Sequence, residues 1–138
     1  EMLTRLDLTL SHGERAASLI QAIVGDYDEN YKLTYIDFSG GQFTVPRKQL
    51  SKGDRVRIRI EARDVSLTIH QQSETSILNI LPVIVDEIAD EGDAQVLVKL
   101  RVGNDLLLSC ITRKSAQQLD LKVGKKLYAQ IKSVALLS

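Results

Sequence analysis

The sequence predicts an all-β protein made of two small barrels with one short helix each. Three observations support this: segments that alternate hydrophobic and polar residues, glycine-containing turns at short intervals between them, and an internal repeat. Short alternating strands separated by turns are typical of small barrels and sandwiches. With 138 residues, the chain has the length of one ordinary domain or of two very small ones.

Three segments show the two-residue period of a half-buried strand, namely residues 55–62, 96–102 and 127–131. Successive side chains of a strand point to opposite faces, so one set in each segment is expected to form the core. The expected core residues are Val56, Ile58, Ile60, Ala62, Val96, Val98, Leu100, Val102, Leu127, Ala129 and Ile131.

Helical signals are few. Residues 112–121 predict one short helix, with Thr112 as its N-cap. The clearest turn signals are the glycines within 40–41, 52–54, 91–93, 103–105 and 123–124.

The chain also reads as two related halves. Residues 43–50 and 108–115 each combine a strand with a helical turn, and each is followed by a glycine turn and an alternating strand. The polar joint at 71–75 predicts a boundary there, with a first barrel in residues 1–72 and a second in 73–138. Barrels of this size are marginal alone, so we expect them to pack against each other or against a second copy.

Composition disfavours several function classes. The 18 basic and 18 acidic residues balance, and only 4% of residues are aromatic, which disfavours a nucleic-acid binder. The sequence has neither a phosphate-binding glycine loop nor a nucleophile-elbow motif, and its two histidines lack metal-ligand spacing, so no catalytic or metal-binding residue is predicted. The lone cysteine, Cys110, is expected to be a small buried hydrophobe.

Five polar residues near the second half are candidates for binding a doubly charged oxyanion: Ser76, Thr112, Ser115, Lys132 and Ser133. Such a guest needs converging hydrogen-bond donors and one compensating cation, and no metal. Each residue also has a plainer interpretation, because Thr112 is a natural N-cap and Lys132 alone is a solvated strand lysine. From the residues alone both interpretations stay open.

Residues 76–137 resemble the molybdate- and tungstate-binding mop domain. The matching pieces are Ser76-Ile77-Leu78-Asn79, Thr112-x-x-Ser115, the Gly124 turn and Ile131-Lys132-Ser133. Together with residues 57–67, they resemble the C-terminal regulatory region of the ATP-binding subunit of bacterial molybdate ABC importers, from Leu3 to the end of the chain.

The resemblance implies an OB-like barrel of the transport-associated (TOBE) type and a molybdate or tungstate site with no covalent cofactor. It implies a homodimer, in which Ser76, Lys132 and Ser133 come from one chain and Thr112 and Ser115 from the other. It further implies an ATPase domain before Glu1, membrane permease partners, and a cytoplasmic location at the inner membrane. Bound oxyanion would then hold the importer inactive.

One position departs from the family pattern. Where the family often has an arginine, this sequence has Leu78, so one charge-assisted hydrogen bond worth roughly 1.5–3 kcal/mol is missing. Two alternatives therefore remain beside the regulatory domain: a stand-alone molybdate storage protein, and a structural TOBE domain from the importer of another solute.

Overall fold

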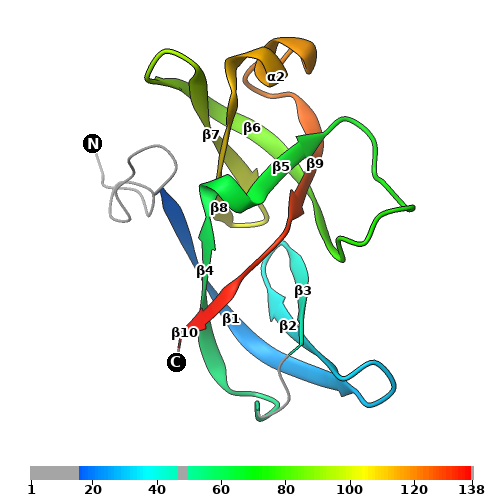
Figure 1. Cartoon of the computed structure of the whole chain (residues 1–138). Coiled ribbons are helices and arrows are strands. Elements are labelled where there is room, and N and C mark those ends of the chain that lie inside the picture. The colour runs from blue at the N-terminus through cyan, green and yellow to red at the C-terminus, as the bar shows by residue number, and fades with distance from the viewer. Residues whose placement is uncertain (1–15, 47–49, 138) are drawn as a thin grey trace.

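The computed structural model describes residues 16–46 and 50–137, and strands dominate them. Figure 1 shows two curled sheets stacked along the long axis of the molecule. The first sheet has the strand order β10-β4-β1-β2-β3. Its strands are β1 (Ala17–Asp28), β2 (Leu33–Phe38), β3 (Gly41–Val45), β4 (Arg55–Glu61) and β10 (Ala135–Leu137).

The second sheet has the order β5-β9-β6-β7-β8. Its strands are β5 (Val65–Thr68), β6 (Asn79–Glu91), β7 (Gln95–Val102), β8 (Asp105–Thr112) and β9 (Lys126–Ile131). A short 3-10 helix, η2 (Ala62–Asp64), joins β4 to β5, and the helix α2 (Arg113–Gln118) follows β8. The all-β prediction is confirmed.

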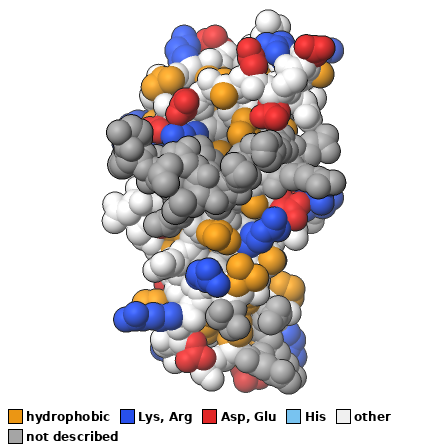
Figure 2. Space-filling view, turned by 90° about the vertical axis from the view of Figure 1, so that its left-hand side faces the viewer, with side chains coloured by type: hydrophobic (Ala, Val, Ile, Leu, Met, Phe, Trp, Pro, Cys, Tyr) orange, Lys and Arg blue, Asp and Glu red, His pale blue; other side chains and the backbone are white. Residues whose placement is uncertain are grey.

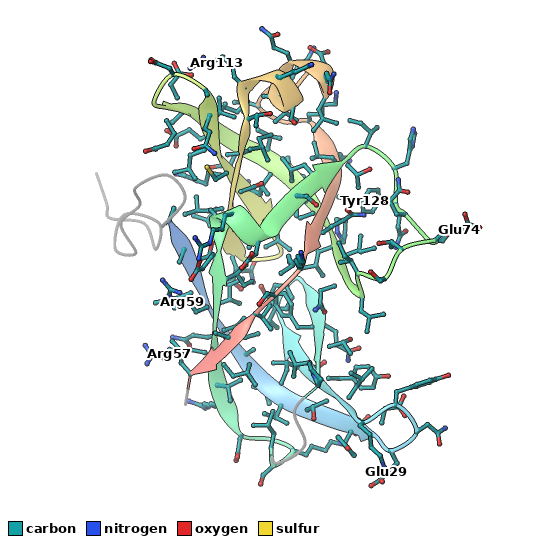
Figure 3. The ribbon with its side chains drawn as sticks, viewed as in Figure 1. Glu29, Arg57, Arg59, Glu74, Arg113 and Tyr128 are labelled. Carbon is teal, nitrogen blue, oxygen red and sulfur yellow. The ribbon has the colours of Figure 1, made fainter. Side chains whose placement is uncertain are left out.

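The predicted alternation is also confirmed. Every hydrophobic residue that was expected in the core from 55–62, 96–102 and 127–131 is buried. In β4 the arginines take the opposite face, where Arg55 and Arg57 are exposed. Figure 3 shows Arg57 and Arg59 pointing outward from the sheet, and Figure 2 shows basic and hydrophobic side chains side by side on that face.

The internal repeat appears as matching strand connections. Strands β1, β2 and β3 pair in sequence, with β4 beside β1, and β6, β7 and β8 pair in the same way, with β9 beside β6. Each repeat then sends one short strand to the other sheet. β5 follows β4 but pairs with β9, whereas β10 follows β9 but pairs with β4.

Sheet membership therefore does not follow the expected boundary between residues 72 and 73. Residues 65–68 precede that boundary and belong to the second sheet, while residues 135–137 follow it and belong to the first. The alternation of hydrophobic and polar residues predicts which face of a strand is buried. It does not predict which neighbouring strand a short strand such as β5 or β10 pairs with. The division into one barrel in residues 1–72 and another in residues 73–138 therefore stays a prediction.

One hydrophobic core runs through both sheets. Phe43, Ile36 and Ile58 of the first sheet belong to the same buried cluster as Leu100 and Ile131 of the second. Burying side chains of this size stabilises the fold by roughly 1.5–3 kcal/mol each. The shared core and the exchanged strands tie the halves together, as expected for barrels that are marginal alone.

Two turns from different halves meet at the centre of the molecule. The Ser39 hydroxyl donates to Asp105 Oδ2 at 2.9 Å and accepts from the Asn104 N–H at 2.9 Å. Gly103 has φ +62, and a Cβ there would lie 2.4 Å from the nitrogen of Gly40. Glycine is therefore required at 103 both by backbone conformation and by the close approach of the other turn.

The predicted helix of the second half is confirmed as α2, with Thr112 as its N-cap. The corresponding helical turn of the first half falls mostly on residues 47–49, which lie outside the described residues. In the part of the chain that the structure describes, no helix has the length and apolar character needed to cross a membrane.

Candidate functional site

A cavity of about 540 Å³ lies where the two halves meet. Its walls come from the end of β3, from the segment leading into β6, and from the connection between β9 and β10. Figure 1 shows this β9–β10 connection passing through the middle of the molecule, beside β3. The cavity thus forms where the strand exchange carries the chain from one sheet to the other.

Three of the five predicted site residues line this cavity: Ser76, Lys132 and Ser133. Lys132 is the only charged residue among the described ones that line it, and no carboxylate does. Within residues 16–46 and 50–137, the side chains of these three residues have no hydrogen-bond or ion-pair partner in the protein. One cation and two hydroxyls therefore remain available to a guest.

Backbone contacts fix the position of Lys132. Its N–H donates to the carbonyl oxygen of Asp64 at 2.9 Å, just beyond the end of β9. The preceding Ile131 is buried and pairs with both Val65 and Asn79. Because side chains alternate along the chain at this point, Lys132 turns away from the core that Ile131 enters. This agrees with the orientation that the sequence predicts.

The remaining two predicted residues, Thr112 and Ser115, lie elsewhere, at the start of α2. The Thr112 hydroxyl accepts from the Ser115 N–H at 3.0 Å and donates to the Ser115 hydroxyl oxygen, also at 3.0 Å. Arg113 holds this end of the helix by bonding Asp90 at 3.0 Å. The plainer interpretation of Thr112 as an N-cap is therefore correct, and the Ser115 hydroxyl proton remains free to donate.

One chain alone does not bring all five residues together. Lys132 follows one end of β9, whereas α2 lies near its other end, as Figure 1 shows. Six strand residues extend over roughly 20 Å, which is far more than one oxyanion can bridge. A site with all five residues needs Thr112 and Ser115 from another copy.

Two polar residues of the cavity were missed by sequence reasoning as contributors. Asn79 begins β6, and its side chain forms two hydrogen bonds with the backbone of Thr44 on β3. Asn79 was noted as part of a motif but was given no role. Thr44 lies in the other half of the chain, so no local signal could have connected it with Ser76 or Lys132.

The first half offers different chemistry at the equivalent position. Matching the buried strand pairs of the two repeats aligns Ile60, opposite Ser18, with Ile131, opposite Asn79. Glu61 then stands where the second half has Lys132, and the buried Ala62 stands where it has Ser133. A carboxylate and a methyl group in place of the cation and the hydroxyl do not favour an anion.

Glu61 is instead part of an ion-pair group on the surface. Its carboxylate accepts from Arg59 at 3.0 Å and pairs with Arg63 at 2.9 Å. The hydrogen bond from Arg59, together with the charge of Arg63, lowers the pKa of Glu61 below its ordinary value of 4.5. This glutamate stays charged at neutral pH.

Neither a metal site nor a reactive thiol emerges from the described residues. Nowhere in residues 16–46 and 50–137 do three or more His, Cys, Asp or Glu side chains gather as metal ligands would. Cys110 is buried, as predicted, and packs with Ala16, Ala62 and Leu108.

The TOBE domain family matches residues 75–137, which include Ser76, Lys132, Ser133 and the helix with its cap. These residues form a TOBE domain. The predicted family resemblance is confirmed for the second half of the chain.

The full length of the chain is similar to part of several ATP-binding proteins. The molybdenum import ATP-binding protein ModC of Albidiferax ferrireducens is 47% identical over 99% of this chain and 37% of that protein. ModC of Methylococcus capsulatus is 42% identical over 99% of this chain and 39% of that protein. The chain spans less than two fifths of the length of these relatives, and it corresponds to their C-terminal domain.

A solved structure shares the fold. The cytoplasmic molybdate-binding protein ModG, determined with molybdate bound, superposes with a TM-score of 0.73 at 24% identity. The superposition covers 87% of this chain and 94% of that one. The OB-like, all-β fold predicted from the sequence is thereby confirmed.

Proposed function

We propose that this TOBE-containing chain is a regulatory domain that binds molybdate or tungstate in the ATP-binding subunit of a molybdate ABC importer. The observation that carries the proposal is the cavity in which Lys132, the only charged lining residue described, stands beside the unpartnered hydroxyls of Ser76 and Ser133. Its ModC relatives are molybdenum import proteins by name, which supports the choice of ligand.

The size of the cavity supports a site that is shared between two chains. A tetrahedral oxyanion has four oxygens and occupies roughly 120 Å³ if each takes the volume of one water. A cavity of about 540 Å³ therefore leaves room for side chains from a partner. We infer a homodimer in which Thr112 and Ser115 of one chain complete the site formed by Ser76, Lys132 and Ser133 of the other.

In the whole protein, this shared site would be occupied when the concentration of the oxyanion is high. A ligand held by two chains stabilises the arrangement in which both contribute and shifts the population toward it. We propose that this arrangement inactivates the importer, whose ATPase domain and permease partners lie outside the stretch described. The protein would act in the cytoplasm, peripheral to the inner membrane. Catalysis would belong to the ATPase domain.

Calorimetric titration tests the ligand. The 138-residue chain is expected to bind molybdate and tungstate, with little response to sulfate at the same concentration. Lys132→Ala removes the compensating cation, so binding is expected to weaken at least tenfold. Lys122→Ala is the matched control, because Lys122 is an exposed lysine outside the cavity, paired with Asp120. Equal affinities for the wild-type chain and the Lys132 variant would contradict the proposal.

Mixing two defective variants tests the shared site. Lys132→Ala damages one side of each site and Ser115→Ala the other, while Ser115→Ala leaves the Thr112 cap oxygen in place. In a mixed dimer one of the two sites has all its donors, so mixing and re-equilibrating the variants is expected to restore tight binding to part of the sample. If each variant is weak and the mixture stays equally weak, the donors do not come from two chains.

One observation favours a second function. Leu78 lines the cavity and is 63% exposed where the resemblance leads us to expect an arginine. A site without that guanidinium compensates less of the charge of an oxyanion. This favours a structural TOBE domain from the importer of another solute, which need not bind an oxyanion. In that case neither molybdate nor tungstate gives saturable heat.

A further inference from the structure

Part of the cavity wall belongs to the other half of the chain. Thr44 lies on β3 between the buried residues Phe43 and Val45, so its side chain takes the opposite face of the strand and lines the cavity. Within residues 16–46 and 50–137, the Thr44 hydroxyl has no hydrogen-bond partner. A free hydroxyl therefore faces the same space as Ser76, Lys132 and Ser133.

Asn79 fixes the position of this threonine. The Thr44 N–H donates to Asn79 Oδ1 at 2.7 Å, and Asn79 Nδ2 donates to the Thr44 carbonyl at 3.1 Å. The carboxamide thus bonds both the N–H and the carbonyl of Thr44, as a residue of a neighbouring strand would. The two residues are 35 positions apart in the sequence. Since Asn79 itself begins β6, two hydrogen bonds link the two walls of the cavity directly.

We propose that Thr44 is an additional ligand of the oxyanion, contributed by the N-terminal half, and that Asn79 is the positioning residue that presents it. This inference rests on the proposed function, because it assigns further residues to the same site. A hydroxyl held by a strand backbone is pre-organised, so it donates to an anion without the entropic cost of ordering a flexible side chain. Thr44 then supplies a donor that does not depend on the second chain.

The equivalent contact in the first half has no hydroxyl at the position of Thr44. There the Ser18 hydroxyl accepts from the Leu108 N–H at 2.9 Å, so a polar residue again links the start of one repeat to a strand of the other. The residue that corresponds to Thr44 is the buried Leu108, and it packs against Ala62. A leucine fills the space there, whereas a threonine in the second site leaves a hydroxyl facing an open cavity.

Titration of variants at Thr44 and Asn79 with sodium molybdate tests the proposal. Thr44→Val keeps the shape and removes the hydroxyl, so affinity is expected to fall roughly tenfold, as for the loss of one hydrogen bond to a charged group. Thr44→Ser keeps the hydroxyl and is expected to retain most of the affinity. Thr68→Val is the matched control, because Thr68 is a half-buried strand threonine that does not line the cavity.

Asn79→Leu is expected to weaken binding to a similar extent, and the Thr44→Val/Asn79→Leu double variant should be little weaker than either single variant. Such non-additivity is expected when one residue acts through the other. If Asn79→Leu does not fold, Asn79→Ser keeps a side-chain acceptor, as Ser18 does, and should give an intermediate affinity.

Two results would overturn the inference without touching the proposed function. Unchanged affinity in Thr44→Val, while Lys132→Ala still weakens binding, removes Thr44 from the site. Full additivity of the Thr44 and Asn79 changes removes the positioning role. Absence of binding in the wild-type chain contradicts the proposed function itself, so the failures are distinguishable.

Discussion

Replacing Leu78 by arginine tests whether the cavity needs only a second cation to bind molybdate tightly. Leu78 lines the cavity and is 63% exposed, so the substitution removes little buried surface and should leave the fold intact. A guanidinium at this position brings a second cation and up to two charge-assisted hydrogen bonds to the guest. We expect Leu78→Arg to bind molybdate more tightly than the wild-type chain.

The expected gain in binding free energy follows from the solvent exposure of residue 78. A hydrogen bond to a charged group contributes about 1.5–3 kcal/mol when it is well sheltered. Because residue 78 is more than half exposed, water screens the interaction, and the gain should lie near the lower end, at about 1.5 kcal/mol. This corresponds to roughly a tenfold lower Kd at 25 °C.

Isothermal titration at low ionic strength, repeated in added salt, measures the effect. Val123→Arg is the matched control, because Val123 is an exposed hydrophobic residue, at 69% accessibility, that does not line the cavity. Both variants raise the net charge equally, so only local contact with the guest distinguishes them. The reasoning is refuted if Leu78→Arg binds no better than wild type, or if Val123→Arg gains as much.

Further predictions concern stability and stoichiometry. Gly92→Ala should cost about 1 kcal/mol, since φ is +73 but nothing lies within 4 Å of the new Cβ. Gly103→Ala should cost clearly more, because its Cβ would lie 2.4 Å from the nitrogen of Gly40; equal urea midpoints for the two variants would contradict the packed-turn explanation. The lowered pKa of Glu61 means that its charged form stabilises the fold above the ordinary pKa of 4.5, and that this contribution is lost as pH falls through the lowered pKa. Glu61→Gln should therefore be less stable than wild type at pH 7 and match it in acid, and a stability difference that is independent of pH would contradict this. Finally, titration should give one molybdate per chain, because the equivalent position in the first half holds Glu61 and a buried alanine; two sites per chain would show that this comparison is wrong.

Local patterns predict most of the secondary structure and one wall of the site. Strand alternation identified the buried faces of β4, β7 and β9, because the period of two is a property of the backbone itself. The N-cap at Thr112 was equally predictable, since the hydroxyl and the N–H that it satisfies are three residues apart. Lys132 was expected to point away from the core for the same local reason.

The sequence by itself determined an all-β chain with two repeats, one capped helix, and a set of hydroxyls and a lysine suited to an oxyanion. Only the tertiary structure decided which of these groups share a cavity. It exchanged β5 and β10 between the sheets, placed Thr44 in the same cavity as Lys132, and left Thr112 and Ser115 at a distance. The physical reason is that strand pairing and the contact between Asn79 and Thr44 join residues far apart in the chain, where local propensity carries no information.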